Sequence, residues 1–351
     1  MLPDARSRQR LTVVAALLLG MVFGAGALRL SGMGGSGDAA AQLADGETSG
    51  PTQFTISSLN ALGADHTDAG GNKHGWASGA QRMKWLTQVI NAEGVEVIGL
   101  QEFQYPQYEV WEQQMGTSWD TYPGLAWGKK GMRNSVSWRS DQWSLVTGSW
   151  MKIPYFHGTI LRMPLVLLQH VTTGQQIYVA SVHNPANARG PAAKWRKQAT
   201  EIEMATVNRL RADTGLPVYL TGDMNERDIF FCRMTAGTDM VAANGGVNTG
   251  SGGLGGCSPT RPTYIDWIMG SPETTFTNYH ANRGPKVRKS TDHPMIVADA
   301  ELPPVLTPDC PTGSPSPTGT PTPTSPPPTT PTTSTPRPTG SPGPNVPSPS
   351  P

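Results

Sequence analysis

The chain has 351 residues and a formal net charge of +1, from 27 Lys and Arg against 26 Asp and Glu. This balance excludes a broadly basic nucleic-acid-binding protein, so any site for a polyanion must be a local patch. Residues 303–351 hold 19 of the 33 prolines and almost no apolar side chains, which predicts a disordered Pro/Thr/Ser-rich tail. About 250 residues, 51–302, remain for one large domain with its own core.

The N-terminus predicts export. Arg6, Arg8 and Arg10 precede an uncharged apolar run over residues 11–28, the pattern of a secretory signal peptide. The run is also just long enough to cross a bilayer, so it could remain as a membrane anchor. Residues 1–50 are therefore interpreted as a signal peptide or anchor plus a flexible segment, and the protein as secreted or attached to the cell surface.

The domain begins with a strand, a loop, a helix and a second strand. Alternating apolar residues predict a strand over 53–60 that ends at Asn60. The polar, Gly-rich segment 65–79 is expected to be a loop, and its His66 and His74 are interpreted as surface residues. Apolar residues on one face predict a helix over 80–92. The next strand, 95–101, is followed directly by Glu102.

Several strands and one long helix are expected in the middle of the domain. Strand patterns cover residues 135–139, 143–153 and 163–170, and the strand 176–183 ends at His183. Pro191 can open a helix whose apolar face continues to Leu210. Hairpin-like runs of strands, with only occasional alternation of helix and strand, indicate mixed sheets.

The most informative segment is 218–226, where a short apolar strand is followed by Asp223 and Asn225. Residues two apart on an extended backbone point to the same side, so the two side chains would project together. A carboxylate there can orient a nucleophile or a metal, and an amide can donate to a phosphate oxygen. An Asx-type turn after the strand explains the same residues without a function.

A carboxylate also interrupts the apolar strand 264–269, at Asp266. A buried carboxylate costs several kcal/mol unless it has a partner. Asp292 and His293, just before the last strand at 296–302, place an imidazole where it can pair with Asp266. Glu102 and Asp292, with Asn60, supply the oxygen ligands that Mg²⁺ or Mn²⁺ prefers.

The three cysteines suit an oxidising exterior. Cys232 and Cys257 bracket a Gly-rich, poorly patterned stretch that a disulfide would hold together. Cys310 is then left over at the start of the tail, and a pairing of Cys310 with either of the other two is the alternative.

Six short segments together resemble the endonuclease/exonuclease/phosphatase family, to which DNase I belongs. They occur in the family's order between residues 53 and 302, and Arg82 in the first helix also fits. The segments are Ser-Leu-Asn60, Gly-Leu-Gln-Glu102, Ser-Val-His183-Asn, Gly-Asp223-Met-Asn225, Ile-Asp266-Trp and Thr-Asp292-His293-Pro. The resemblance implies an α/β fold, a four-layer α/β/β/α sandwich with two mixed sheets packed face to face.

The resemblance also implies a role for each site residue. Glu102 would be the main metal ligand, aided by Asn60 and Asp292. The catalytic residues would be Asp223, which orients or deprotonates water, His293 paired with Asp266 at the phosphate, and Asn225 and His183 on phosphate oxygens. The sequence departs from some nucleases of the family at Leu62, where they carry a second acid, and this bears on a second metal.

The substrate is left among three classes. A basic rim that includes Arg283, Arg288 and Lys289 favours a nuclease acting on DNA or RNA, although an ordinary solvated surface explains it equally. A lipid or inositol-phosphate phosphodiesterase or phosphatase, similar to sphingomyelinase, is the second reading, and Trp150–Tyr155 would be its apolar hairpin. A non-catalytic surface binding module is the third. A monomer is expected in each case.

Overall fold

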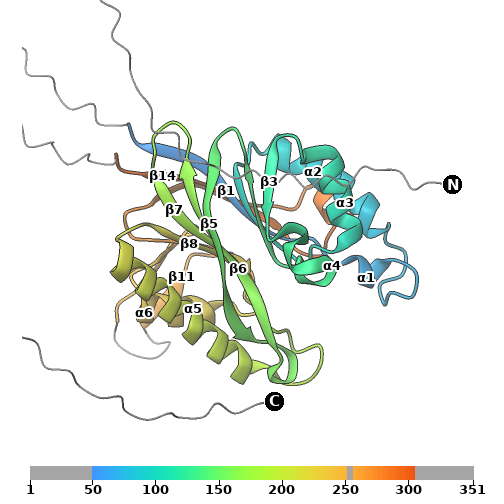
Figure 1. Cartoon of the computed structure of the whole chain (residues 1–351). Helices are drawn as coiled ribbons and strands as arrows, with labels where there is room; N and C mark the ends of the chain where they lie inside the picture. Colours follow the sequence, from blue (N-terminus) through green and yellow to red (C-terminus); the bar gives the residue numbers. More distant parts are fainter. Residues whose placement is uncertain (1–49, 251–255, 305–351) are drawn as a thin grey trace, which may run out of the picture. The chain divides into compact units, whose positions relative to one another are not determined.

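The computed structural model describes residues 50–250 and 256–304, which form two six-stranded β-sheets packed face to face with helices outside them (Figure 1). The leader, including residues 11–28, and the Pro-rich tail with Cys310 lie outside the described residues. Among the described residues, no helix has the length and apolarity that a bilayer crossing requires.

The first sheet has the strand order β13-β14-β1-β2-β4-β3. Only β1 and β2 run parallel, and every other neighbouring pair in this sheet is antiparallel. Its strands are β1 (Thr52–Asn60), β2 (Val97–Gln101), β3 (Trp119–Tyr122), β4 (Ser135–Arg139), β13 (Thr275–Asn282) and β14 (Met295–Leu302).

The second sheet has the order β5-β6-β7-β8-β12-β9, with β7 and β8 as its parallel pair. Its strands are β5 (Trp143–Pro154), β6 (Ile160–His170), β7 (Gln176–His183), β8 (Val218–Asp223), β9 (Val241–Ala242) and β12 (Asp266–Gly270). A separate two-stranded ribbon pairs β10 (Gly246–Asn248) with β11 (Cys257–Pro259).

The longer helices pack on or beside the sheets, and short ones lie in the connections. The long helices are α2 (Gly79–Ala92), α3 (Tyr105–Met115) and α5 (Ala193–Thr214), and α6 (Asp228–Gly237) is of intermediate length. The shorter ones are α1 (Ala64–Thr67), α4 (Gly128–Gly131), α7 (Pro285–Arg288) and the 3₁₀ turns η1 (Gly124–Trp127) and η2 (Phe156–Gly158).

Three buried clusters hold the four layers together, one between the two sheets and one between each sheet and its helices. Phe54 and Ile56 of β1 point between the sheets, whereas Leu59 points the other way, toward the cluster shared with α2 and α3. This is the two-residue alternation of a strand that is buried on both faces. A third cluster joins the outer face of the second sheet to α5 and α6. The expected α/β fold with two mixed sheets is confirmed.

The two sheets approach each other closely near the carboxyl ends of β2, β7 and β8, and Gly99 of β2 permits this approach. A Cβ atom at Gly99 would lie 1.9 Å from Thr221 Oγ1 and 3.2 Å from Ser181 Oγ on the opposite sheet. Gln101 donates to Ser181 Oγ at 3.0 Å across the same gap. The contact between the two sheets is therefore polar near these strand ends and apolar in the rest of the cluster between the sheets.

Some local expectations were wrong. Pro191 does not open α5, which begins at Ala193 with Ala192 as its N-cap residue. The stretch after Cys232 is not uniformly irregular, because Cys232 lies inside α6. The loop 65–79 contains the short helix α1 at its start. In contrast, α2 begins and ends within one residue of the predicted helix, with Ser78 accepting a hydrogen bond from Gln81 N as its cap.

Candidate active site

The ends of five strands bring most of the predicted carboxylates and imidazoles together. Asn60 and Gln101 are partners on the parallel strands β1 and β2, so Glu102 follows at the same edge. On the other sheet, Asp223 is the register partner of both His183 on β7 and Asp266 on β12. Because the two sheets face each other, these five strand ends share one edge of the sandwich.

Asn60 connects the two sheets at this edge. Its Nδ2 donates to Asp223 Oδ2 at 3.0 Å and faces Glu102 Oε1 at 3.4 Å. Its Oδ1 accepts the Leu62 backbone N–H at 3.0 Å. In this orientation Asn60 holds the two carboxylates beside each other, and it offers oxygen to a metal only after its amide rotates.

Asp223 lies between two imidazoles. Its Oδ2 is 3.5 Å from His183 Nε2 and 3.7 Å from His293 Nε2, and the residue is 2% exposed. His293 Nδ1 in turn lies 2.9 Å and 3.1 Å from the two oxygens of buried Asp266. Burial lowers the pKa of His293, but Asp266 and Asp223 outweigh it and raise the pKa to about 10. His293 is therefore an imidazolium at neutral pH, with Nε2–H directed into the site.

The backbone after β8 makes the Asx-type turn that the sequence also allowed. Asn225 has φ +49° and donates its N–H to Asp223 Oδ1 at 2.9 Å, while its Nδ2 donates to Asn184 O at 2.8 Å. The turn and the site thus use the same residues. One N–H of the Asn225 amide group is engaged, and the second remains for a ligand.

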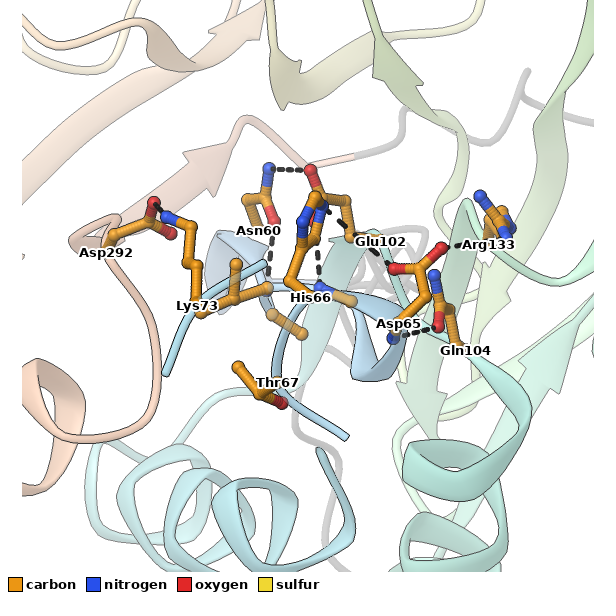
Figure 2. Close-up of polar contacts among 12 residues, drawn as sticks. Asn60, Asp65, His66, Thr67, Lys73, Glu102, Gln104, Arg133 and Asp292 are labelled. Atoms are coloured by element: carbon orange, nitrogen blue, oxygen red, sulfur yellow. Dashed lines mark hydrogen bonds and ion pairs between the residues drawn. The ribbon is translucent and has the colours of Figure 1, made fainter. Parts of the chain in front are cut away.

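Glu102 is held in place by groups from the segment after β1 (Figure 2). Its Oε2 accepts the Gly63 N–H at 2.8 Å and lies 3.4 Å from His66 Nε2. Burial raises the pKa of Glu102, but the hydrogen bond from His66, the charge of His183 and the Gly63 N–H hold the pKa well below its usual range. The carboxylate is ionised throughout the physiological range.

Asp292, the third of the predicted metal ligands, lies in the loop before β14. Figure 2 shows Lys73 reaching from the α1–α2 loop to pair with Asp292. Neighbouring Thr291 donates its hydroxyl to Asn60 O at 2.7 Å. Buried Arg82 donates to the carbonyl oxygens of Ala61 and Ser290, which ties the end of β1 to the loop that carries Asp292.

Three residues at the site were missed or misread in the sequence. His66 is not simply a surface residue, since Glu102 raises the pKa of its imidazole to about 9 through their hydrogen bond. Lys73 pairs with Asp292. Tyr155 stands edge-on to His183 at 5.5 Å, and burial together with Glu102 and Asp223 raises the pKa of its hydroxyl. His66 lies in the four-residue helix α1, Lys73 in the loop after it and Tyr155 between β5 and η2, so none of them belongs to a long element with a strand or helix pattern.

The predicted basic rim packs over aromatic rings. Arg283 lies 4.9 Å from the centre of the Tyr264 ring, and Lys289 lies 3.8 Å from that of Trp85. Arg288 and Lys289 line a cleft together with His74, Trp76 and Trp85. Arg288 and Lys289 therefore belong to a surface formed by α2, α7 and the loop before α2, whereas Arg283 follows β13 and packs on Tyr264.

The expected disulfide is present between Cys232 and Cys257, with a Cα–Cα distance of 5.7 Å. It joins α6 to β11, at the two ends of the segment that contains residues 251–255, which are not described.

The donor set suits a hard divalent cation. The Glu102 and Asp292 carboxylates are both partly exposed, and each has a positive group beside it, His66 at Glu102 and Lys73 at Asp292. A second group, Asp223, Asp266 and His293, has one donor atom of each within 4.8 Å of the others. In this second group, His293 is already hydrogen-bonded to Asp266.

Comparison with known families decides the assignment. The sequence matches the model of the Endonuclease/Exonuclease/phosphatase family over residues 58–293, which include all of the strand-end residues described above. The chain belongs to this family. Members of the endonuclease/exonuclease/phosphatase family are metal-dependent phosphoester hydrolases, and the protein is an enzyme of that class. No curated protein sequence matches the chain significantly.

Solved structures of family proteins share the fold at low sequence identity. A Bacteroides thetaiotaomicron family protein has a TM-score of 0.55 and 18% identity, with 72% of this chain and 96% of that chain covered. A humanized D. rerio TDP2 has a TM-score of 0.53 and 15% identity, covering 71% and 98%. The B. thetaiotaomicron mannosyl-6-phosphatase has a TM-score of 0.50 and 18% identity, covering 72% and 100%.

Proposed function

We propose that the protein is an exported phosphodiesterase that uses Mg²⁺ or Mn²⁺ and cleaves DNA or RNA. The observation that carries the proposal is the continuous set of contacts from Glu102 through Asn60 to Asp223, and from there to His293 and Asp266. This set places a carboxylate site for a cation beside an imidazolium and a second carboxylate. Together these three elements can stabilise the phosphate, position water and accept its proton, as hydrolysis of a phosphoester requires.

The proposed roles follow from the contacts. Glu102 and Asp292, aided by Asn60, would hold the ion, which when bound neutralises negative charge on the phosphate in the transition state. The His293 Nε2–H would donate to a phosphate oxygen, and Asp266 would keep the ring oriented and charged.

The attacking water belongs at Asp223. Its Oδ2 faces both His183 Nε2 and His293 Nε2, so a water there would have an acceptor for its proton and donors that fix its position. Asn225 would donate its second N–H to a phosphate oxygen, since the first is bound by Asn184 O.

Nucleic acid is favoured as substrate by an aromatic and basic surface beside His183. The Tyr155 ring contacts His183 edge-on and packs against Phe156 in a tilted arrangement, with ring centres 4.4 Å apart. Arg189 lies over Phe156 at 5.2 Å, and Lys194 lies over Trp195 at 4.2 Å. Aromatic rings stack bases and cations contact the phosphate backbone, so this alternation suits a flexible strand.

Nicking of supercoiled plasmid, with and without EDTA, tests the proposal. We expect metal-dependent nicking that falls by at least about 100-fold in Glu102→Gln and in His293→Gln. Glu201→Gln, on an exposed ion pair of α5, is the matched control and should retain full activity. Absence of nicking by the folded wild type with Mg²⁺ and Mn²⁺ would reject a nuclease.

A lipid phosphodiesterase or phosphatase is the second candidate, and an exposed apolar surface on the β5–β6 hairpin favours it. Trp150 and Ile160 are 45% and 56% exposed, and Leu145 and Val146 are exposed nearby. Choline release from sphingomyelin vesicles, or phosphate release from inositol and sugar phosphates, without plasmid nicking would select this class. Inactivity on all substrates with metal bound would instead favour a surface binding module.

Export and assembly are part of the same proposal. The Cys232–Cys257 disulfide and the apolar run at residues 11–28 both favour an extracellular protein. N-terminal sequencing of the protein recovered from the culture medium and the membrane fraction distinguishes a cleaved signal peptide from a retained anchor. Light scattering coupled to size exclusion checks the expected monomer.

A further inference from the structure

We infer that His66 is a nitrogen ligand to the ion bound by Glu102, so that the site prefers Mn²⁺ and similar imidazole-binding ions over Mg²⁺. The inference rests on the proposed function, because it adds one ligand to the proposed cation site. His66 comes from α1, immediately after β1, and its Nε2 lies 3.4 Å from Glu102 Oε2. Figure 2 shows the ring beside Asn60 and Glu102.

The loop after α1 is folded back so that it supports this ring. The Lys73 N–H donates to His66 O at 2.8 Å, and the Gly71 N–H donates to Asp68 O at 2.8 Å. A Cβ atom on Gly71 would lie 2.4 Å from the His66 carbonyl, so only glycine allows the chain to return this closely. Asp68 Oδ1 also accepts the Gly79 N–H at the start of α2, which anchors the loop.

Because the loop folds back onto α1, Asn72 sets the orientation of the His66 imidazole. His66 Nδ1 lies 2.9 Å from Asn72 Oδ1, an oxygen that accepts, so this contact assigns the Nδ1 proton. The lone pair of neutral His66 is then on Nε2, directed at the Glu102 carboxylate. Metal-ligating histidines commonly donate the N–H of their second nitrogen to an oxygen acceptor, as His66 Nδ1 does to Asn72.

The distance between the donor atoms fits a shared ion. A nitrogen and an oxygen that each lie about 2.1 Å from one cation are about 3.0–3.4 Å apart, for ligand angles from 90° to tetrahedral. The observed separation of 3.4 Å falls in this range. Two carboxylates, Glu102 and Asp292, plus an imidazole make a mixed oxygen and nitrogen set, which suits Mn²⁺ or Zn²⁺ better than Mg²⁺.

Other groups around the ring have partners of their own. Asp65 Oδ1 is 4.0 Å from His66 Nε2, but Asp65 Oδ2 is paired with Arg133 at 3.2 Å. Lys73 pairs with Asp292. In the metal-free protein, a proton on Nε2 bridges His66 and Glu102, and an incoming ion would replace that proton.

Electron spin echo envelope modulation of Mn²⁺ bound to the full-length protein tests for the nitrogen directly. We expect ¹⁴N modulation in the wild type that is lost in His66→Gln, and Mn²⁺ affinity, measured by calorimetry, that falls by about 10–100-fold. Mg²⁺ affinity should change by less than about threefold, because Mg²⁺ binds through oxygen. His74→Gln, in the same loop, is the matched control and should behave as wild type.

A second variant separates loss of the ligand from damage to the loop. Asn72→Ala leaves the imidazole in place but frees its orientation, so the ¹⁴N modulation should persist while Mn²⁺ affinity falls by about tenfold. Unchanged modulation and affinity in folded His66→Gln would overturn the inference. Tighter binding of both ions in that variant would also overturn it, since His66 would then be a competing cation.

The same titrations separate this inference from the proposed function. Mn²⁺ binding that is abolished by Glu102→Gln but insensitive to His66→Gln would remove only the nitrogen ligand. Absence of Mn²⁺ and Mg²⁺ binding by the wild type, or binding insensitive to Glu102→Gln, would remove the proposed cation site itself.

Discussion

Glu203 should make the stability of the domain fall with rising pH. It lies on α5 with no exposed surface, and Asn184 supplies the hydrogen-bonding side chain that faces its carboxyl group. Burial, and to a smaller degree the charge of Glu226, raise the pKa of Glu203 from 4.5 to about 8. The folded protein therefore keeps this carboxyl group neutral, with a proton to donate.

The size of the effect follows from the shift. Between pH 4.5 and about 8 the unfolded chain releases the Glu203 proton while the folded chain retains it, so stability decreases as pH rises through this window. At about 1.4 kcal/mol per pH unit, a rise in the pKa of Glu203 from 4.5 to about 8 lowers the free energy of unfolding above pH 8 by about 5 kcal/mol. Below pH 4.5 the group contributes no penalty. Domains of this kind have about 5–15 kcal/mol in total, so the change is large.

Urea unfolding of wild type and Glu203→Gln at several pH values from 5 to 9 measures this pH-dependent change in the free energy of unfolding. Glutamine imitates the neutral carboxyl, so the variants should be similar at pH 5, and Glu203→Gln should be the more stable by several kcal/mol at pH 9. Glu201→Gln, exposed on the same helix, should show no such pH-dependent difference. A difference between wild type and Glu203→Gln that is the same at every pH would refute the reasoning.

Three further changes test the frame around the site. Arg82→Met should destabilise the domain by about 3–5 kcal/mol in urea unfolding, because it removes buried hydrogen bonds to backbone carbonyls. Gly99→Ala should cost about 1–3 kcal/mol through its contact with Thr221, and Thr221→Ala should recover part of that loss in the double variant. Reduction of the Cys232–Cys257 disulfide should lower thermal stability by about 3 kcal/mol, measured by calorimetry with and without reductant.

Much of the fold could be predicted because strand and helix patterns are strong in the core. The strands that end at Asn60 and His183 alternate or are uniformly apolar, and α2 has a clear apolar face, so their positions agree with the structure to within one or two residues. Helices α3 and α6 were not predicted, because α3 carries many polar residues and α6 follows directly on the turn at Asn225.

The site could be predicted only where its residues end strands. Asp266 was informative since a carboxylate in an apolar strand requires a partner, and the structure supplies His293. His66 ends up beside Lys73 because the loop after α1 folds back at Gly71, and no periodicity in the sequence predicts that fold-back. Tyr155 reaches the site through the β5–β6 hairpin, so its position depends on strand register rather than on neighbours in the chain.

The most direct test of the account is the rate of plasmid cleavage in saturating Mn²⁺, compared between wild type and Glu102→Gln with Glu201→Gln as the control. The account predicts metal-dependent cleavage by wild type and the control, and a loss of at least about 100-fold in Glu102→Gln. Cleavage by Glu102→Gln at the wild-type rate, or cleavage that persists in EDTA, would contradict the claim that these strand ends form a cation-dependent phosphodiesterase site.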